Sequence, residues 1–164
     1  MLRDIVIDTN VFLHAHDSRL TCSGDANRVL TILRQSTTYL CIDEGFDTNP
    51  ARNASLIGGE YLEHFHHGSV PFAIITELAG AQRLLPVSKK VHPSIGRKIN
   101  QILRDPRDRT FLKVSINSVN RFFCCHDFID FSPAKRSSIK RDFDVNIKTE
   151  AETLPSMLPP DGDI

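Results

Sequence analysis

The start of the chain constrains the fold most, because a short apolar strand there runs directly into a group of polar side chains. Residues 5–7 are Ile-Val-Ile, and such β-branched runs favour a strand that is buried on both faces, as in a parallel sheet. Asp8, Thr9 and Asn10 follow this run. Since open α/β sheets bind ligands at the carboxyl ends of their strands, we expect Asp8 to lie at a binding edge. Capping of a helix that begins near Val11 is the alternative role for Asp8 or Asn10.

Further along the chain, apolar segments with strand character alternate with segments of helical periodicity. Such alternation predicts an α/β fold: a three-layer α/β/α sandwich with a central, mostly parallel sheet. Pro86 argues against a central position for its strand. Residues 43–59, rich in Asp, Asn, Gly and Pro, are expected to form a loop. The expected strands are 4–8, 37–42, 83–87, 121–127 and 144–148, and the expected helices are 24–34, 60–66, 71–79, 93–103, 105–115 and 133–140.

Acidic residues recur at the starts of helices and the ends of strands. Asp108 stands near the start of the helix expected after Pro106, and Asp127 ends the apolar strand that follows it. Together with Asp8, these positions resemble the PIN-domain family of metal-dependent nucleases. The resembling motifs are Ile-Asp8-Thr-Asn, Asp108-Arg-Thr-Phe-Leu and His-Asp127-Phe-Ile-Asp130-Phe, which stand in the order and approximate separation of that family over residues 1–150.

The same family carries a further acid in the middle of the chain. Here Glu60, followed by Tyr61, resembles the Glu-Tyr helix start used by one branch of the family. Glu60 is favoured because the helix that it opens has a buried face. Asp43, Glu44 and Glu77 are the other mid-chain candidates.

The resemblance implies a metal-dependent endoribonuclease that uses Mg²⁺ or Mn²⁺ and leaves a 5′ phosphate and a 3′ hydroxyl. Clustered carboxylates repel one another unless a divalent cation neutralises them, and magnesium acidifies the waters that it retains. We expect Asp8 and Asp108 to bind the principal ion, while Glu60 and Asp127 orient the attacking water or complete a second metal site. Asn10, Thr9 and Asp130 are expected to support these acids.

The resemblance also suggests partners. RNA is the expected substrate, with single-stranded DNA as the alternative, and many compact members of the family are toxins held inactive by an antitoxin protein. Symmetric dimers are frequent among them. The formal net charge is zero, from 20 basic and 20 acidic residues, so any attraction for nucleic acid must be local. The basic residues expected to contact the substrate are Arg104, Arg107, Arg109, Lys135 and Arg136; solvated helix faces are the alternative explanation for them.

Other features predict a cytoplasmic protein with one nuclease domain, residues 1–148, and a disordered tail, residues 149–164. No segment approaches the roughly 20 apolar residues of a membrane helix, and no secretory signal is recognisable. The four cysteines lack metal-ligand spacing and are expected to be small apolar residues in a reducing compartment. The seven histidines do not form a common zinc motif, so the carboxylates favour magnesium or manganese over zinc.

Two other functional classes remain open from the sequence. A phosphatase of the haloacid-dehalogenase type also begins with an apolar strand and an Asp-containing loop, but it would require a second Asp where Asn10 stands. A catalytically inactive PIN-like scaffold that binds RNA or protein is the non-enzymatic alternative.

Overall fold

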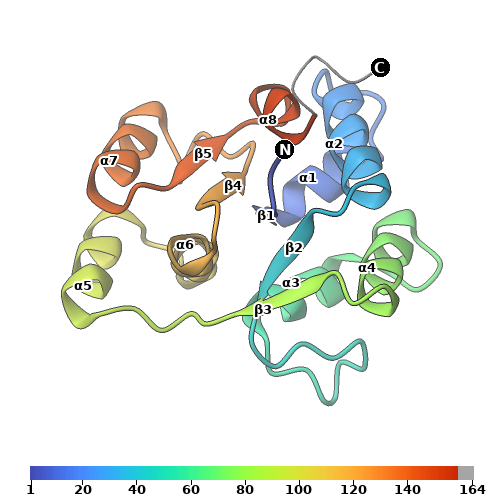
Figure 1. Ribbon diagram of the computed structural model, residues 1–164, viewed down its shortest axis with the longest axis horizontal. Helices are drawn as coiled ribbons and strands as arrows, with labels where there is room; N and C mark the ends of the chain where they lie inside the picture. Colours follow the sequence, from blue (N-terminus) through green and yellow to red (C-terminus); the bar gives the residue numbers. More distant parts are fainter. Residues whose placement is uncertain (159–164) are drawn as a thin grey trace.

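The computed structural model describes residues 1–158 and contains a five-stranded, entirely parallel sheet (Figure 1). The strand order is β3-β2-β1-β4-β5, so the first strand of the chain is the central one. The expected three-layer α/β/α sandwich is thus confirmed. The strands are β1 (Asp4–Ile7), β2 (Tyr39–Asp43), β3 (Leu84–Val87), β4 (Phe122–Cys124) and β5 (Asn146–Lys148); the helices are α1 (Thr9–His14), α2 (Ser23–Gln35), α3 (Leu56–His64), α4 (Val70–Gly80), α5 (Pro93–Ile102), α6 (Pro106–Asn117), α7 (Pro133–Phe143) and α8 (Glu150–Met157).

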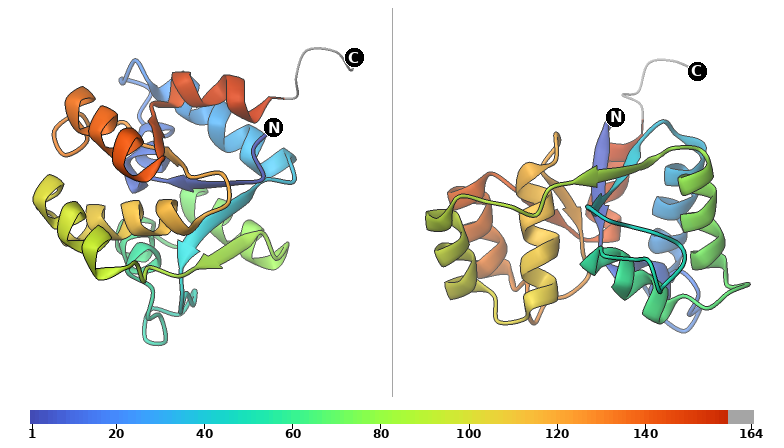
Figure 2. Two further views of the ribbon diagram at one scale, coloured as in Figure 1. Left: turned by 60° about the vertical axis from the view of Figure 1, so that its left-hand side comes forward. Right: turned by 90° about the horizontal axis from the view of Figure 1, so that it is seen from below.

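Helices cover both faces of the sheet. Helices α5, α6 and α7 lie on one side, and α2 and α4 lie on the other (Figure 2). Helix α6 contacts β1, β2 and β4, while α8 packs against α2. Because every strand is parallel, all five carboxyl ends meet at one edge of the sheet. The loops that follow β1 and β4 therefore lie side by side.

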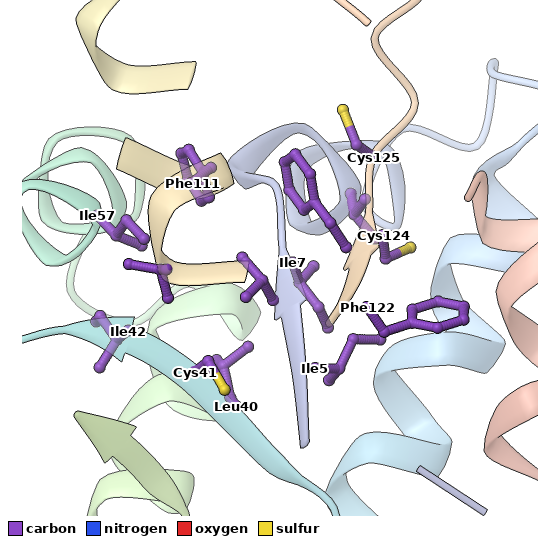
Figure 3. Close-up of a cluster of buried hydrophobic side chains, with 14 of the residues drawn as sticks. Ile5, Ile7, Leu40, Cys41, Ile42, Ile57, Phe111, Phe122, Cys124 and Cys125 are labelled. Carbon is purple, nitrogen blue, oxygen red and sulfur yellow. The ribbon is translucent and has the colours of Figure 1, made fainter. Parts of the chain in front are cut away.

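The core forms where the apolar strands meet the buried helix faces. All of β1 is buried, and Figure 3 shows Ile5 and Ile7 among side chains of β2, β4 and α6. Cys41, Cys124 and Cys125 are buried, as the sequence predicted, and the four cysteines are free thiols. The sulfur atoms of Cys124 and Cys125 point away from each other (Figure 3), as neighbouring side chains on a strand do.

The edge position of β3 agrees with the expectation from Pro86. The strand pairs with β2 alone, and Pro86 lies opposite Ile42 in the register. Proline lacks an amide hydrogen and is tolerated where one side of a strand has no neighbour.

The structure corrects the expected start of α3. The helix begins at Leu56, four residues before Glu60, and Ser55 caps it by accepting a hydrogen bond from the amide of Gly58 over 2.8 Å. Gly58 and Gly59 are therefore inside the helix rather than in the preceding loop. A Cβ at Gly58 would stand 2.3 Å from Cδ2 of Phe46, so the loop packs on the helix at a place that only glycine leaves open.

The expected disorder of residues 149–164 is wrong for residues 149–158. Thr149 caps α8 in a reciprocal capping box with Glu152, which satisfies two amides that a helix start otherwise leaves without partners. Leu154 and Met157 are buried against the core. Residues 159–164 lie outside the described part of the chain. Within residues 1–158, none of the helices has both the length and the apolar character needed to cross a membrane.

Candidate metal centre at the carboxyl edge of the sheet

Asp8 lies at the carboxyl end of the central strand and is 8% exposed. Its Oδ1 accepts a hydrogen bond from the amide of Asn10 over 3.2 Å, so Asp8 is the N-cap of α1. Its Oδ2 accepts from the thiol of Cys125 over 3.1 Å. Asp8 can therefore cap α1 and also belong to a group of acidic residues at this edge of the sheet. The exposed Asn10 supports Asp8 through its backbone amide.

Glu60 is held beside Asp8 by the start of α1 and the middle of α3. The hydroxyl of Thr9 donates to Oε1 of Glu60 over 2.8 Å. The next residue, Tyr61, is buried and donates its hydroxyl hydrogen to the carbonyl of Ile7 over 2.6 Å. These two bonds fix α3 against the end of β1. Thr9 therefore supports Glu60 and makes no hydrogen bond to Asp8 within the described residues.

Three further carboxylates come together from α6 and from the loop after β4. Asp108 is the third residue of α6, whose N-cap is Asp105. One carboxylate oxygen from each of Asp108, Asp127 and Asp130 lies within 4.8 Å of the others. Oδ1 of Asp127 accepts from the amides of Ile129 and Asp130, over 2.6 and 3.1 Å. This turn brings Asp130, which the sequence assigned only a supporting role, into the closest acidic group.

The acids influence one another electrostatically. Burial, together with the charges of Asp130, Asp105, Asp8 and Asp127, raises the pKa of Asp108 to about 7. Burial, and to a smaller extent the charge of Asp127, raises the pKa of Asp8. Burial and the charge of Asp8 likewise raise the pKa of Glu60, against the lowering effect of the Thr9 hydrogen bond. Each of the four acids predicted from the sequence is therefore near enough to another to change its pKa or have its own pKa changed. The acidic site consists of these four, Asp8, Glu60, Asp108 and Asp127, together with Asp130.

Asp43 is a buried acid whose charge is compensated by groups of the protein itself. This residue ends β2 and is fully buried. Its carboxylate accepts from the ammonium of Lys89 over 2.7 Å and from the amides of Leu56 and Ile57 over 2.9 Å each. Burial raises the pKa of Asp43, but these donors and the Ser55 hydroxyl outweigh it, so the net pKa is lowered.

The acidic site has no such counter-ion. Within residues 1–158, no Lys or Arg side chain lies within 4.0 Å of the carboxylates of Asp8, Glu60, Asp108, Asp127 or Asp130. Uncompensated carboxylates in a partly buried site are unfavourable. An all-oxygen donor set of this kind fits Mg²⁺ or Mn²⁺.

The structure distinguishes among the four candidates for the mid-chain acid of the site. Asp43 is occupied by Lys89 and by the start of α3. Glu44 is exposed, and Glu77 pairs with Arg34 on the surface at 2.8 Å. Of the four candidates, Glu60 is the one whose pKa responds to Asp8.

The predicted basic residues have different environments. Arg104 and Arg107 are exposed near the start of α6, and Arg107 lies 3.7 Å from Glu63. Arg109 donates to the carbonyl of Leu103 over 2.9 Å. Lys135 is partly exposed on α7. Arg136 donates to the carbonyls of Phe131, Cys125 and Asp127 over 2.7 to 3.0 Å, so its guanidinium organises the acidic loop itself.

Cys125 is a site residue that the sequence analysis treated only as an apolar strand residue. It bridges two of the acids, because its thiol donates to Asp8 while its sulfur accepts from the amide of Asp127 over 3.4 Å. Burial and the charge of Asp8 raise the pKa of this thiol, so it is protonated and able to donate. Its position directly after β4 was the available signal, since that edge is where Asp8 was expected.

No protein-family model, curated protein or solved structure matches this chain.

Proposed function

We propose that the chain is a magnesium- or manganese-dependent ribonuclease that hydrolyses phosphodiester bonds at the acidic site. The observation that carries this proposal is the grouping of Asp108, Asp127 and Asp130, with Asp8 near enough to raise the pKa of both Asp108 and Glu60. Within residues 1–158, no Lys or Arg side chain lies within 4.0 Å of these five carboxylates. A buried acid elsewhere in the chain, Asp43, has Lys89 to neutralise it. The PIN-like order of the motifs supports the same function.

Asp108, Asp127 and Asp130 would hold the cation, because an oxygen of each lies within 4.8 Å of the others. Asp8, which the sequence analysis expected to bind the principal ion with Asp108, is outside this group but near enough to raise the pKa of Asp108. When bound, the cation supplies positive charge that stabilises the anionic phosphate oxygens and acidifies water. Glu60 stands beside this group with a raised pKa, which makes its carboxylate a better proton acceptor for the attacking water at neutral pH. Thr9 and Tyr61 keep Glu60 in position, and the Cys125 thiol orients Asp8.

Arg104 and Arg107, at the start of α6, are the proposed contacts to the phosphate backbone of the RNA. Both are exposed and both precede Asp108 in the sequence. Basic side chains beside an acidic metal site attract a phosphodiester without neutralising the site itself. A nuclease with an overall net charge of zero would depend on such local attraction, so cleavage should weaken steeply as salt rises.

The test is cleavage of a mixed pool of structured and unstructured RNA by the purified chain with Mn²⁺ or Mg²⁺. Asp8→Asn and Asp108→Asn, as well as a chelator, should each abolish cleavage while circular dichroism stays unchanged. Asp105→Asn is the matched control, since Asn caps a helix as well as Asp does and Asp105 is exposed. Cleavage that persists in both site variants would contradict the proposal. A folded chain that neither binds Mn²⁺ nor cuts RNA would support the scaffold alternative.

A further inference from the structure

A second cluster of ligating side chains lies next to the acidic site but has different chemistry. It consists of His14 at the end of α1, Cys22 at the N-cap of α2, His126 in the loop after β4, and Glu150 at the start of α8. One ligand atom from each of the four lies within 4.8 Å of the others. The four residues come from four separate segments, so this grouping is a product of the tertiary fold.

Glu150 is the centre of the cluster and is 1% exposed. Its Oε1 lies 3.3 Å from Nδ1 of His14, and its Oε2 lies 2.6 Å from Nδ1 of His126. The two imidazole rings pack edge to face, with their centroids 5.2 Å apart. No Lys or Arg side chain of residues 1–158 lies within 4.0 Å of this buried carboxylate. Among residues 1–158, the two histidines, when protonated, are the only groups that bring positive charge within hydrogen-bonding distance of Glu150.

The donor atoms favour a different ion from the one at the acidic site. Two imidazole nitrogens, one thiolate sulfur and one carboxylate oxygen make up a set of four, which suits tetrahedral Zn²⁺. Magnesium and manganese prefer oxygen donors, whereas thiolate and imidazole select zinc and its neighbours in the transition series. The partial exposure of both histidines leaves a route for an ion to enter.

We propose that His14, Cys22, His126 and Glu150 form a zinc-binding site, separate from the acidic site, that fastens α8 to α1, α2 and the loop after β4. His126 immediately precedes Asp127 and follows Cys125, so an ion held here fixes the loop that carries part of the acidic group. The proposal does not depend on the nuclease function, because ion binding and folding are measured without RNA.

The experiment is zinc titration of the metal-stripped full chain by calorimetry, with cobalt as a spectroscopic substitute. We expect one zinc ion per chain at this site and a thiolate-to-cobalt charge-transfer band that Cys22→Ser abolishes. His14→Gln should weaken zinc binding at least tenfold. His16→Gln is the matched control, since His16 is exposed and lies two residues further along the chain; it should bind zinc as tightly as the unmodified chain.

Three results would overturn the proposal. The first is the absence of zinc binding by a chain that circular dichroism shows to be folded. The second is equal zinc affinity in the His14→Gln and His16→Gln variants. The third is loss of zinc binding in Asp108→Asn, which would assign the ion to the acidic site. If replacement of the buried Glu150 prevents folding, Cys22→Ser and His14→Gln still decide the question, because Cys22 and His14 are only partly buried.

Discussion

The hydroxyl of Thr9 donates a hydrogen bond of 2.8 Å to Oε1 of Glu60, across 51 residues of sequence. This bond joins the first turn of α1 to the middle of α3 and holds Glu60 next to Asp8. Within the proposed mechanism, it determines where the proton-accepting carboxylate stands.

Thr9→Val should therefore lower metal-dependent RNA cleavage by about tenfold or more, because a misplaced catalytic group loses efficiency steeply. The loss of the buried hydrogen bond should also cost about 1 kcal/mol of unfolding free energy. Thr38→Val is the matched control: Thr38 is buried and its hydroxyl donates to the carbonyl of Leu2 over the same 2.8 Å, away from the site. Equal loss of cleavage in the two variants would show that only stability matters.

Asp108→Asn should stabilise the metal-free chain above neutral pH. The folded-state pKa of about 7 exceeds the ordinary 3.8, so the folded chain binds more protons than the unfolded chain between these values and loses stability as pH rises from about 4 to 7. Asn removes this penalty, which amounts to about 2–4 kcal/mol. Urea unfolding with chelator at pH 8 and at pH 3.5 measures it. The advantage should be present at pH 8 and absent at pH 3.5. Asp105→Asn, which removes one of the charges that raise the pKa of Asp108, should show only a small part of it.

Lys89→Met should destabilise the fold by about 2 kcal/mol at pH 7, because it leaves the buried Asp43 carboxylate without its cation. The partial exposure of Lys89 to solvent weakens the ion pair and keeps the loss at this size. The depressed pKa of Asp43 contributes stability that is present above pH 4 and is lost as pH falls through the folded-state value. The destabilisation by Lys89→Met should therefore shrink in acid. Lys90→Met, at the exposed neighbour, is the control. RNA cleavage below the unfolding temperature should be unchanged, since Asp43 lies outside the acidic group.

Gly58→Ala should destabilise the chain, whereas Gly59→Ala should not. The added methyl at Gly58 meets Phe46 at 2.3 Å, and its nearest neighbour at Gly59 is Nδ2 of Asn53 at 3.4 Å. Both glycines lie within α3, where alanine is otherwise favoured by roughly 1 kcal/mol. Thermal unfolding compares the two variants directly, and equal melting temperatures would contradict the packing described here.

Met157→Ala tests the docking of α8. Met157 is fully buried, and truncation of such a side chain costs about 2–5 kcal/mol. Leu158→Ala, at an exposed neighbour, should cost little. Chemical denaturation of the full chain measures both. Indistinguishable stabilities would mean that α8 does not pack as the structure has it.

The parts of the fold that the sequence predicted well are those specified by local patterns. The Ile-Val-Ile run determines β1 and places Asp8 at its end. The helical periodicity after Pro106 predicted α6, in which Phe111 and Val114 are buried. The start of α3 was missed because Gly58 and Gly59 resemble a boundary, whereas the close approach of Phe46 requires glycine inside the helix. Only the tertiary structure reveals that requirement.

Helix α8 and the histidine cluster were missed for related reasons. The three prolines after Thr149 and the low apolar content favoured disorder. The Thr149–Glu152 capping box nevertheless starts a helix, and Leu154 and Met157 suffice to dock it. Glu150 meets His14 only because α8 packs on α2. No spacing rule brings together ligands that stand more than 100 residues apart.

The central place of the first strand has a consequence for how the protein folds. β1 pairs with β2 and with β4, so the second pairing closes a loop of more than 110 residues. Contacts of such long range form slowly, because the entropy of closing the loop is lost before the pairing energy is gained. Asp8 stands 117 residues before its hydrogen-bond partner Cys125, so the segment between them must be synthesised before the two can meet. The acidic site therefore cannot form until the long-range pairing of β1 with β4 brings Cys125 beside Asp8.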